Sequence, residues 1–119
     1  MLDNLGKERQ GNDMMKNMTP HVLRIFDAEG VTLLAEIPPS GQVARVAVSR
    51  GAAGSHDGLP LFRTVTGLPE GLPAPVAGVT YIVSLVVRQA LPERGDLASP
   101  GQLIRGDDGQ PVGCRGLDV

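Results

Sequence analysis

The sequence predicts an α+β fold, a mostly antiparallel β-sheet of six or seven short strands with one short helix at about residues 84–91. The chain of 119 residues holds 16 glycines and 10 prolines, about twice the usual share of each, which favours short elements joined by turns. Short β-prone apolar runs separated by turn residues recur from residue 21 onward. One segment begins with Ser84, a favoured N-cap, and continues with an apolar stripe.

The length allows one domain. Hydrophobic residues make up 41% of the chain and charged residues 20%, so the chain can form a core. Residues 1–16 are polar and have no hydrophobic period, which predicts a flexible N-terminal tail. Residues 17–119 are expected to form a single compact β-rich domain.

Apolar runs and turn residues predict the first strands in order. Residues 21–26 and 31–37 flank a turn and predict a hairpin. Residues 43–48 alternate with period two and predict a third strand. The three glycines of residues 51–58 predict a mobile loop, and residues 59–65 predict a fourth strand.

The second half of the chain begins with a proline-stiffened connection and the most β-prone segment, which suits a central strand buried on both faces. A helix is predicted after it, although the β-branched Val86 and Val87 are also compatible with a longer strand. The predicted elements are the connection (67–75), the strand (79–83), the helix (84–91), a loop (93–101) and a closing hairpin (103–117).

The charge balance and the apolar runs exclude several classes of partner. The net charge is -2 and no run of lysines or arginines occurs, so nucleic acid is not an expected partner. The longest apolar run, residues 79–87, is shorter than the ~20 residues that span a bilayer, so a membrane is not expected either. Because Cys114 is the only cysteine and no signal peptide precedes the domain, we expect a cytoplasmic protein.

The sequence predicts neither a metal nor another cofactor. His21, His56 and one cysteine do not make a zinc-binding set. Neither of the glycine-rich phosphate-binding motifs occurs. Cys114 fits a small buried apolar residue, and the alternative is a thiol activated by its arginine neighbour.

Several polar residues are candidates for ligand binding, each with a structural alternative. Ser84 marks a helix start that attracts anions, or simply caps the helix. Thr19 and His21, on a proline-stiffened segment, are either ligand contacts or a turn cap and a strand residue. Arg45 interrupts an apolar strand and needs an anionic partner if buried. Arg94 and Asp96 form either a loop-ordering ion pair or part of a site.

Blocks of residues spread over nearly the whole chain after Lys16 carry a resemblance. The opening Asn17-Met18-Thr19-Pro20-His21 is similar to the Asn-Leu-Thr-Pro-His opening of a family of small uncharacterised phage and prophage proteins. The other similar blocks are Ala44-Arg45-Val46, Gly58-Leu59-Pro60, Gly71-Leu72-Pro73, Tyr81-Ile82-Val83-Ser84, Arg94-Gly95-Asp96 and Gly113-Cys114. The Tyr-Ile-Val-Ser block is the most distinctive, and it adds Tyr81 to the candidate ligand-binding residues. The resemblance implies a viral or prophage origin, hence the host cell cytoplasm, and no established activity.

Small phage proteins without an enzymatic signature often act against host defences, and this supplies the functional hypotheses. The leading one is a non-catalytic protein that sequesters a small anionic, nucleotide-derived signal. The alternative is an inhibitor that binds a host defence protein directly, through an exposed strand edge. An enzyme that uses a histidine with Asp57 or Asp96 is a third and less supported hypothesis. Unpaired strand edges also predict a homo-oligomer.

Overall fold

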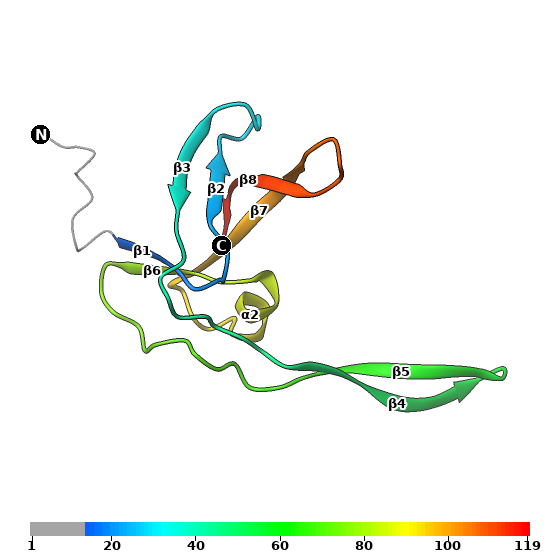
Figure 1. The fold of residues 1–119 in the computed structure, drawn as a ribbon. Helices are drawn as coiled ribbons and strands as arrows, with labels where there is room; N and C mark the ends of the chain where they lie inside the picture. Colours follow the sequence, from blue (N-terminus) through cyan, green and yellow to red (C-terminus); the bar gives the residue numbers. More distant parts are fainter. Residues whose placement is uncertain (1–13) are drawn as a thin grey trace, which may run out of the picture.

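The computed structural model describes residues 14–119 and has a β-rich α+β fold, as predicted. Within that range it contains eight strands and one helix (Figure 1). Their bounds are β1 Met14–Asn17, β2 Leu23–Phe26, β3 Leu33–Ile37, β4 Val48–His56, β5 Leu59–Thr66, β6 Val79–Ile82, α2 Leu85–Ala90, β7 Leu97–Arg105 and β8 Pro111–Asp118.

Six strands form one sheet in the order β1-β6-β7-β8-β2-β3. The pairs β1–β6, β6–β7 and β2–β8 are parallel, whereas β7–β8 and β2–β3 are antiparallel. The sheet is therefore mixed, and the expectation of mostly antiparallel pairing is corrected. The parallel pairs join segments that are far apart in the chain. Because no short turn connects such strands, no local turn signal in the sequence predicts their pairing.

Strand β7 connects the two halves of the sheet. Its first residues pair with β6, with Tyr81 opposite Leu97, and its later residues pair antiparallel with β8. Residues 97–101 were expected to lie in a loop. They are instead almost wholly buried strand, because β6 and β8 both supply backbone partners for them.

The core lies where β6 and β7 pack against the helix. Strand β6 was expected to be a central strand buried on both faces; it is an interior strand next to the edge strand β1, and its last two residues, Tyr81 and Ile82, are buried. Val87 is the one buried residue of α2. The buried cluster consists of Met18, Ala44, Tyr81, Val83, Val87 and Leu97.

Strands β4 and β5 form a separate two-stranded ribbon, called here the arm, which extends away from the sheet and the helix (Figure 1). The segment 51–58, expected to be a mobile loop, supplies most of β4 and the Asp57–Gly58 turn. Residues 43–47 were expected to form a strand but form only a single bridge, between Arg45 and Glu70. The arm also departs from the compact shape expected of residues 17–119.

The expected tail is partly strand, because residues 14–16 belong to β1 and pair in parallel with β6. Residues 1–13 of that tail lie outside the described residues. No helix within residues 14–119 is long and apolar enough to cross a membrane.

Candidate functional site

Two hollows lie at the two ends of helix α2. The first, called here the start hollow, has a volume of about 1130 Å³ and lies where the helix start meets β2, β7 and β8. Three candidate residues from the sequence, Thr19, His21 and Ser84, come together in its lining. The remaining lining residues are Pro20, Val22, Leu23, Arg24, Leu85, Pro100, Gly101, Leu103, Gln110, Pro111, Val112, Gly113 and Cys114.

Thr19 and His21 are held in place by Asn17, which is only 1% exposed. The Asn17 amide nitrogen donates to the carbonyl oxygens of His21, at 2.7 Å, and Ile37, at 3.0 Å. Its side-chain oxygen accepts from the backbone N–H of Thr19 and from the Thr19 hydroxyl, at 2.9 and 2.7 Å. The Thr19 hydroxyl is thus engaged inside the protein, which favours the structural interpretation of this residue.

Ser84 has the role that its sequence position predicts. It has extended backbone angles, and its hydroxyl oxygen accepts from the Val87 N–H at 3.3 Å, so Ser84 is the N-cap of α2. The capping interpretation is confirmed.

The start hollow is poor in positive charge. Arg24 is the one arginine or lysine in its lining. The Nε atom of Arg24 lies 2.9 Å from the Glu36 carboxylate, and both side chains are at least half exposed. Because both side chains of this pair are exposed to water, which screens their charges, the hollow suits an apolar group better than an anion.

Cys114 lines the same hollow but is almost completely buried. Burial raises the pKa of its thiol above the ordinary value. The sulfur also donates to the Gly116 carbonyl oxygen at 3.4 Å. Since the thiolate is the reactive form, this environment favours the small buried residue over the activated thiol.

Arg45 and Tyr81 lie outside both hollows. The Arg45 backbone exchanges two hydrogen bonds with Glu70, and its side chain is exposed. Tyr81 is 2% exposed and belongs to the core cluster. The structure therefore does not gather all seven candidate residues into one site.

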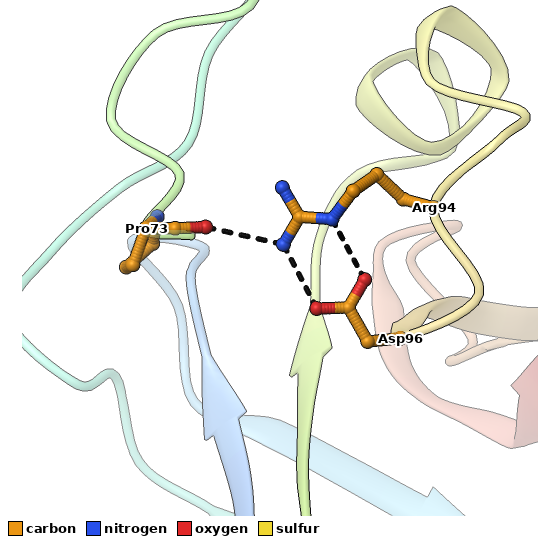
Figure 2. A network of polar contacts seen from close by, with 3 residues as sticks. All are labelled: Pro73, Arg94 and Asp96. Carbon is orange, nitrogen blue, oxygen red and sulfur yellow. Dashed lines mark hydrogen bonds and ion pairs between the residues drawn. The ribbon is translucent and has the colours of Figure 1, made fainter. Parts of the chain in front are cut away.

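Arg94 and Asp96 form a two-point ion pair just after the helix (Figure 2). Nε and Nη2 of Arg94 donate to the two carboxylate oxygens of Asp96, each at 2.8 Å. Nη2 also donates to the carbonyl oxygen of Pro73 at 3.1 Å. The hydrogen bond to Arg94 holds the pKa of the Asp96 carboxyl below its ordinary value. The predicted loop-ordering ion pair is confirmed.

The second hollow, called here the end hollow, has a volume of about 520 Å³ and contains Arg94. It also contains Arg88, which the sequence analysis did not select. Nε of Arg88 donates to the hydroxyl of the fully buried Ser99 at 2.8 Å. The lining consists of Arg88, Gln89, Leu91, Pro92, Arg94, Gly95, Leu97 and Val119.

A sequence signal for this pair of arginines exists. Arg88 lies in the last turn of α2, and Arg94 lies in the loop between α2 and β7. Because Arg88 and Arg94 lie on either side of the end of a short helix, both side chains can reach the same part of the surface. Sequence alone does not show that Ser99 fixes Arg88, because that contact joins the helix to β7.

Comparisons with known protein families, with curated proteins and with solved structures found no match. The resemblance to small phage proteins therefore stays a prediction. Within residues 14–119, no group of three or more histidine, cysteine, aspartate or glutamate side chains is placed to hold a metal ion.

Proposed function

We propose that this protein is a non-catalytic binding protein for a small anionic ligand of nucleotide type, and that the end hollow holds its negative charge. The observation that carries the proposal is the presence of two anchored guanidinium groups in one hollow, Arg94, which pairs with Asp96, and Arg88, which has no acidic partner within residues 14–119. Guanidinium groups match phosphate and carboxylate oxygens in pairs of hydrogen bonds.

Both arginines keep donors for a ligand after their internal contacts are made. Arg88 uses Nε on Ser99, and its two terminal nitrogens make no hydrogen bond to any residue of 14–119. Arg94 uses Nε and Nη2, and Nη1 points away from the Asp96 carboxylate (Figure 2). Because the internal contacts fix both groups, an anion would bind without first ordering two long side chains.

The rest of the lining suits the uncharged part of such a ligand. The apolar part of the wall consists of Leu91, Pro92 and Leu97. The side-chain amide of Gln89 supplies both a hydrogen-bond donor and an acceptor. A volume of about 520 Å³ falls within the ~300–1,000 Å³ range of small-molecule sites. A nucleotide combines a flat, mostly apolar base with a phosphate, so the chemistry of this hollow fits that class.

This function, together with the resemblance to phage proteins, supports a role in counter-defence. A protein that holds a nucleotide-derived signal without changing it lowers the free concentration of that signal in the host cytoplasm. The alternative is direct inhibition of a host defence protein. The exposed arm favours a protein–protein contact, and the experiment below distinguishes the two.

The test is isothermal titration calorimetry of the purified full-length chain with a panel of cyclic and linear adenine and guanine nucleotides, including ADP-ribose types. We expect at least one to bind, and Arg88→Gln to weaken it about 10- to 100-fold, the effect of losing about 1.5–3 kcal/mol of charged hydrogen bonding. Arg45→Gln, an exposed arginine outside both hollows, is the matched control and should bind normally.

Further outcomes of these measurements decide between the hypotheses. Ligand released by heating should be chemically unchanged, which supports holding rather than turnover. If no nucleotide binds the folded protein, or if Arg24→Gln rather than Arg88→Gln abolishes binding, the proposed site is wrong. A stoichiometric host protein retained by the chain in the absence of nucleotide binding would favour direct inhibition.

A further inference from the structure

The tip of the arm holds a residue in an uncommon backbone conformation. Asp57 has a φ of 52°, and within residues 14–119 it is the one residue other than glycine with a positive φ. Asp57 and Gly58, whose φ is 78°, form the turn between β4 and β5, and both are exposed. A side chain in the left-handed region costs free energy that glycine avoids. The turn is therefore strained and open to water.

The polar groups at the tip are not held in place by hydrogen bonds. The charged neighbour of the Asp57 carboxylate is His56, whose Nε2 lies 3.5 Å from Oδ2, and the two side chains are 85% and 79% exposed. The Gly58 N–H donates to no backbone oxygen of residues 14–119, and nothing lies within 4 Å of a Cβ at Gly58. The carboxyl carbon of Asp57 and the backbone nitrogen of Gly58 are therefore free to approach each other.

We propose that Asp57 is a site of spontaneous isomerisation to isoaspartate. The Gly58 nitrogen attacks Cγ of the protonated Asp57 carboxyl group, so that an N–Cγ bond forms and a Cγ–O bond breaks. The proton of the nitrogen and the hydroxyl group leave together as one water molecule, and the product is a five-membered succinimide ring. Water then opens the ring. Cleavage of the N–Cγ bond restores aspartate, whereas cleavage between the nitrogen and the backbone carbonyl carbon gives isoaspartate, with no net change in mass.

A second Asp-Gly pair in the same chain provides an internal comparison. Asp108 and Gly109 lie in the exposed turn between β7 and β8. The Asp108 carboxylate accepts from the Gln110 N–H at 3.0 Å, and the Gly109 N–H donates to the Gly106 carbonyl oxygen at 2.9 Å. Both reacting groups are thus engaged, and both hydrogen bonds must break before a ring can form. The same dipeptide is free at the tip of the arm and held at the second turn.

Isomerisation changes the arm and leaves the proposed ligand site intact. In isoaspartate the chain runs through the Cβ atom, which adds one methylene group to the backbone of a two-residue turn. That turn sets the pairing of His56 with Leu59, so the added atom disturbs the end of the ribbon. No residue of 48–66 lines either hollow, so the modification is independent of ligand binding.

Ageing of the purified full-length chain at neutral pH and body temperature tests the proposal. A protease that cuts before aspartate but not before isoaspartate, followed by mass spectrometry of the peptides, measures isomerisation at each position. In the folded chain, isoaspartate should form at least about tenfold faster at position 57 than at position 108, because two hydrogen bonds protect the second site. In urea these hydrogen bonds are absent, and the two rates should become similar.

A matched pair of variants tests the same ring closure with a different leaving group. Asp57→Asn and Asp108→Asn should form the ring with loss of ammonia instead of water, and asparagine tolerates a positive φ, so the fold should be kept. Deamidation of the folded chain should again be faster in Asp57→Asn than in Asp108→Asn. Equal rates at the two positions in the folded wild type, a faster reaction at position 108, or equal deamidation of the two variants would each overturn the proposal.

Discussion

Arg88 and Ser99 join the helix to the sheet, since Nε of Arg88 donates to the buried Ser99 hydroxyl at 2.8 Å. The contact fixes the last turn of α2 over the start of β7. It also directs Arg88 to the hollow that Arg94 enters from the following loop. An ion pair of Arg94 with Asp96 fixes that second guanidinium group, so the two positive charges are anchored from different elements.

The Arg94–Asp96 pair predicts a specific dependence of stability on pH. The folded-state pKa of Asp96 is lowered, so the pair stabilises the fold above the unfolded-state pKa of about 3.9. That stability is lost as the pH falls through the lowered pKa. Asp96→Asn should cost about 2 kcal/mol at neutral pH, as expected for charged hydrogen bonds.

Urea unfolding of the wild type and of Asp96→Asn at a series of pH values measures this effect. The difference in the free energy of unfolding should be constant at neutral pH and shrink as the pH falls below about 4. Asp107→Asn, in an exposed turn, is the control and should be neutral. A difference that persists unchanged in acid would show that the loss comes from packing rather than from the charge.

Asn17→Ala is expected to be strongly destabilising. Asn17 is 1% exposed, and its side chain joins the carbonyl oxygens of His21 and Ile37 to the Thr19 turn. Removing it takes one donor from each of the part-buried hydrogen bonds to the His21 and Ile37 carbonyl oxygens and takes the acceptor from Thr19, a loss of about 2–4 kcal/mol for several such hydrogen bonds. Urea unfolding checks this, with the exposed Gln102→Ala as a control that should change little. A loss below about 1 kcal/mol would mean that water replaces the amide.

Alanine substitutions at Gly101 and at Gly95 are expected to change the stability of the fold differently. A Cβ atom at Gly101 would clash with the backbone carbonyl of Arg115 on the paired strand β8, and neither strand can move aside freely. Gly101→Ala should therefore lower the free energy of unfolding by about 1–3 kcal/mol. Nothing lies within 4 Å of a Cβ at Gly95, so Gly95→Ala should be neutral or slightly stabilising. Thermal unfolding measures the stability of both variants. Equal losses of stability would contradict the predicted clash at Gly101.

Cys114 is expected to react slowly in the folded protein. Its side chain is buried and its thiol pKa is raised, so both access and thiolate content are low. Alkylation by iodoacetamide at neutral pH should be at least about tenfold slower in the native chain than in urea. Mass spectrometry of the alkylated fraction measures the rates. Equal rates would place the thiol at the surface of the start hollow.

The features that sequence predicted well have local causes. The β2–β3 hairpin follows from two apolar runs around a turn that ends in Gly30, whose φ is 76°. The helix start follows from Ser84, which offers its oxygen to an N–H three residues ahead. Each of these depends on residues that are neighbours in the chain, so a single sequence contains the information.

The arm shows where local reasoning failed. Three glycines indicated a loop, yet pairing with β5 draws residues 48–56 into a strand. Asp57 and Gly58, with φ of 52° and 78°, form the two-residue turn that an Asp-Gly pair favours. The Asp57–Gly58 turn signal is present in the sequence, but the glycines around it also favour a loop.

By itself, the sequence determined the β-rich class, the strand that begins at Val79 and the capped helix, because these depend on local propensity and short-range contacts. It left the ion pair of Arg94 with Asp96 as one of two interpretations, and the structure decided between them. Tertiary structure alone decided the parallel pairs of the sheet, the free-standing arm and the meeting of Arg88 with Arg94. These depend on backbone partners and side-chain contacts between segments distant in the chain. The residue pattern within a segment does not indicate with which distant segment it will pair or make contact.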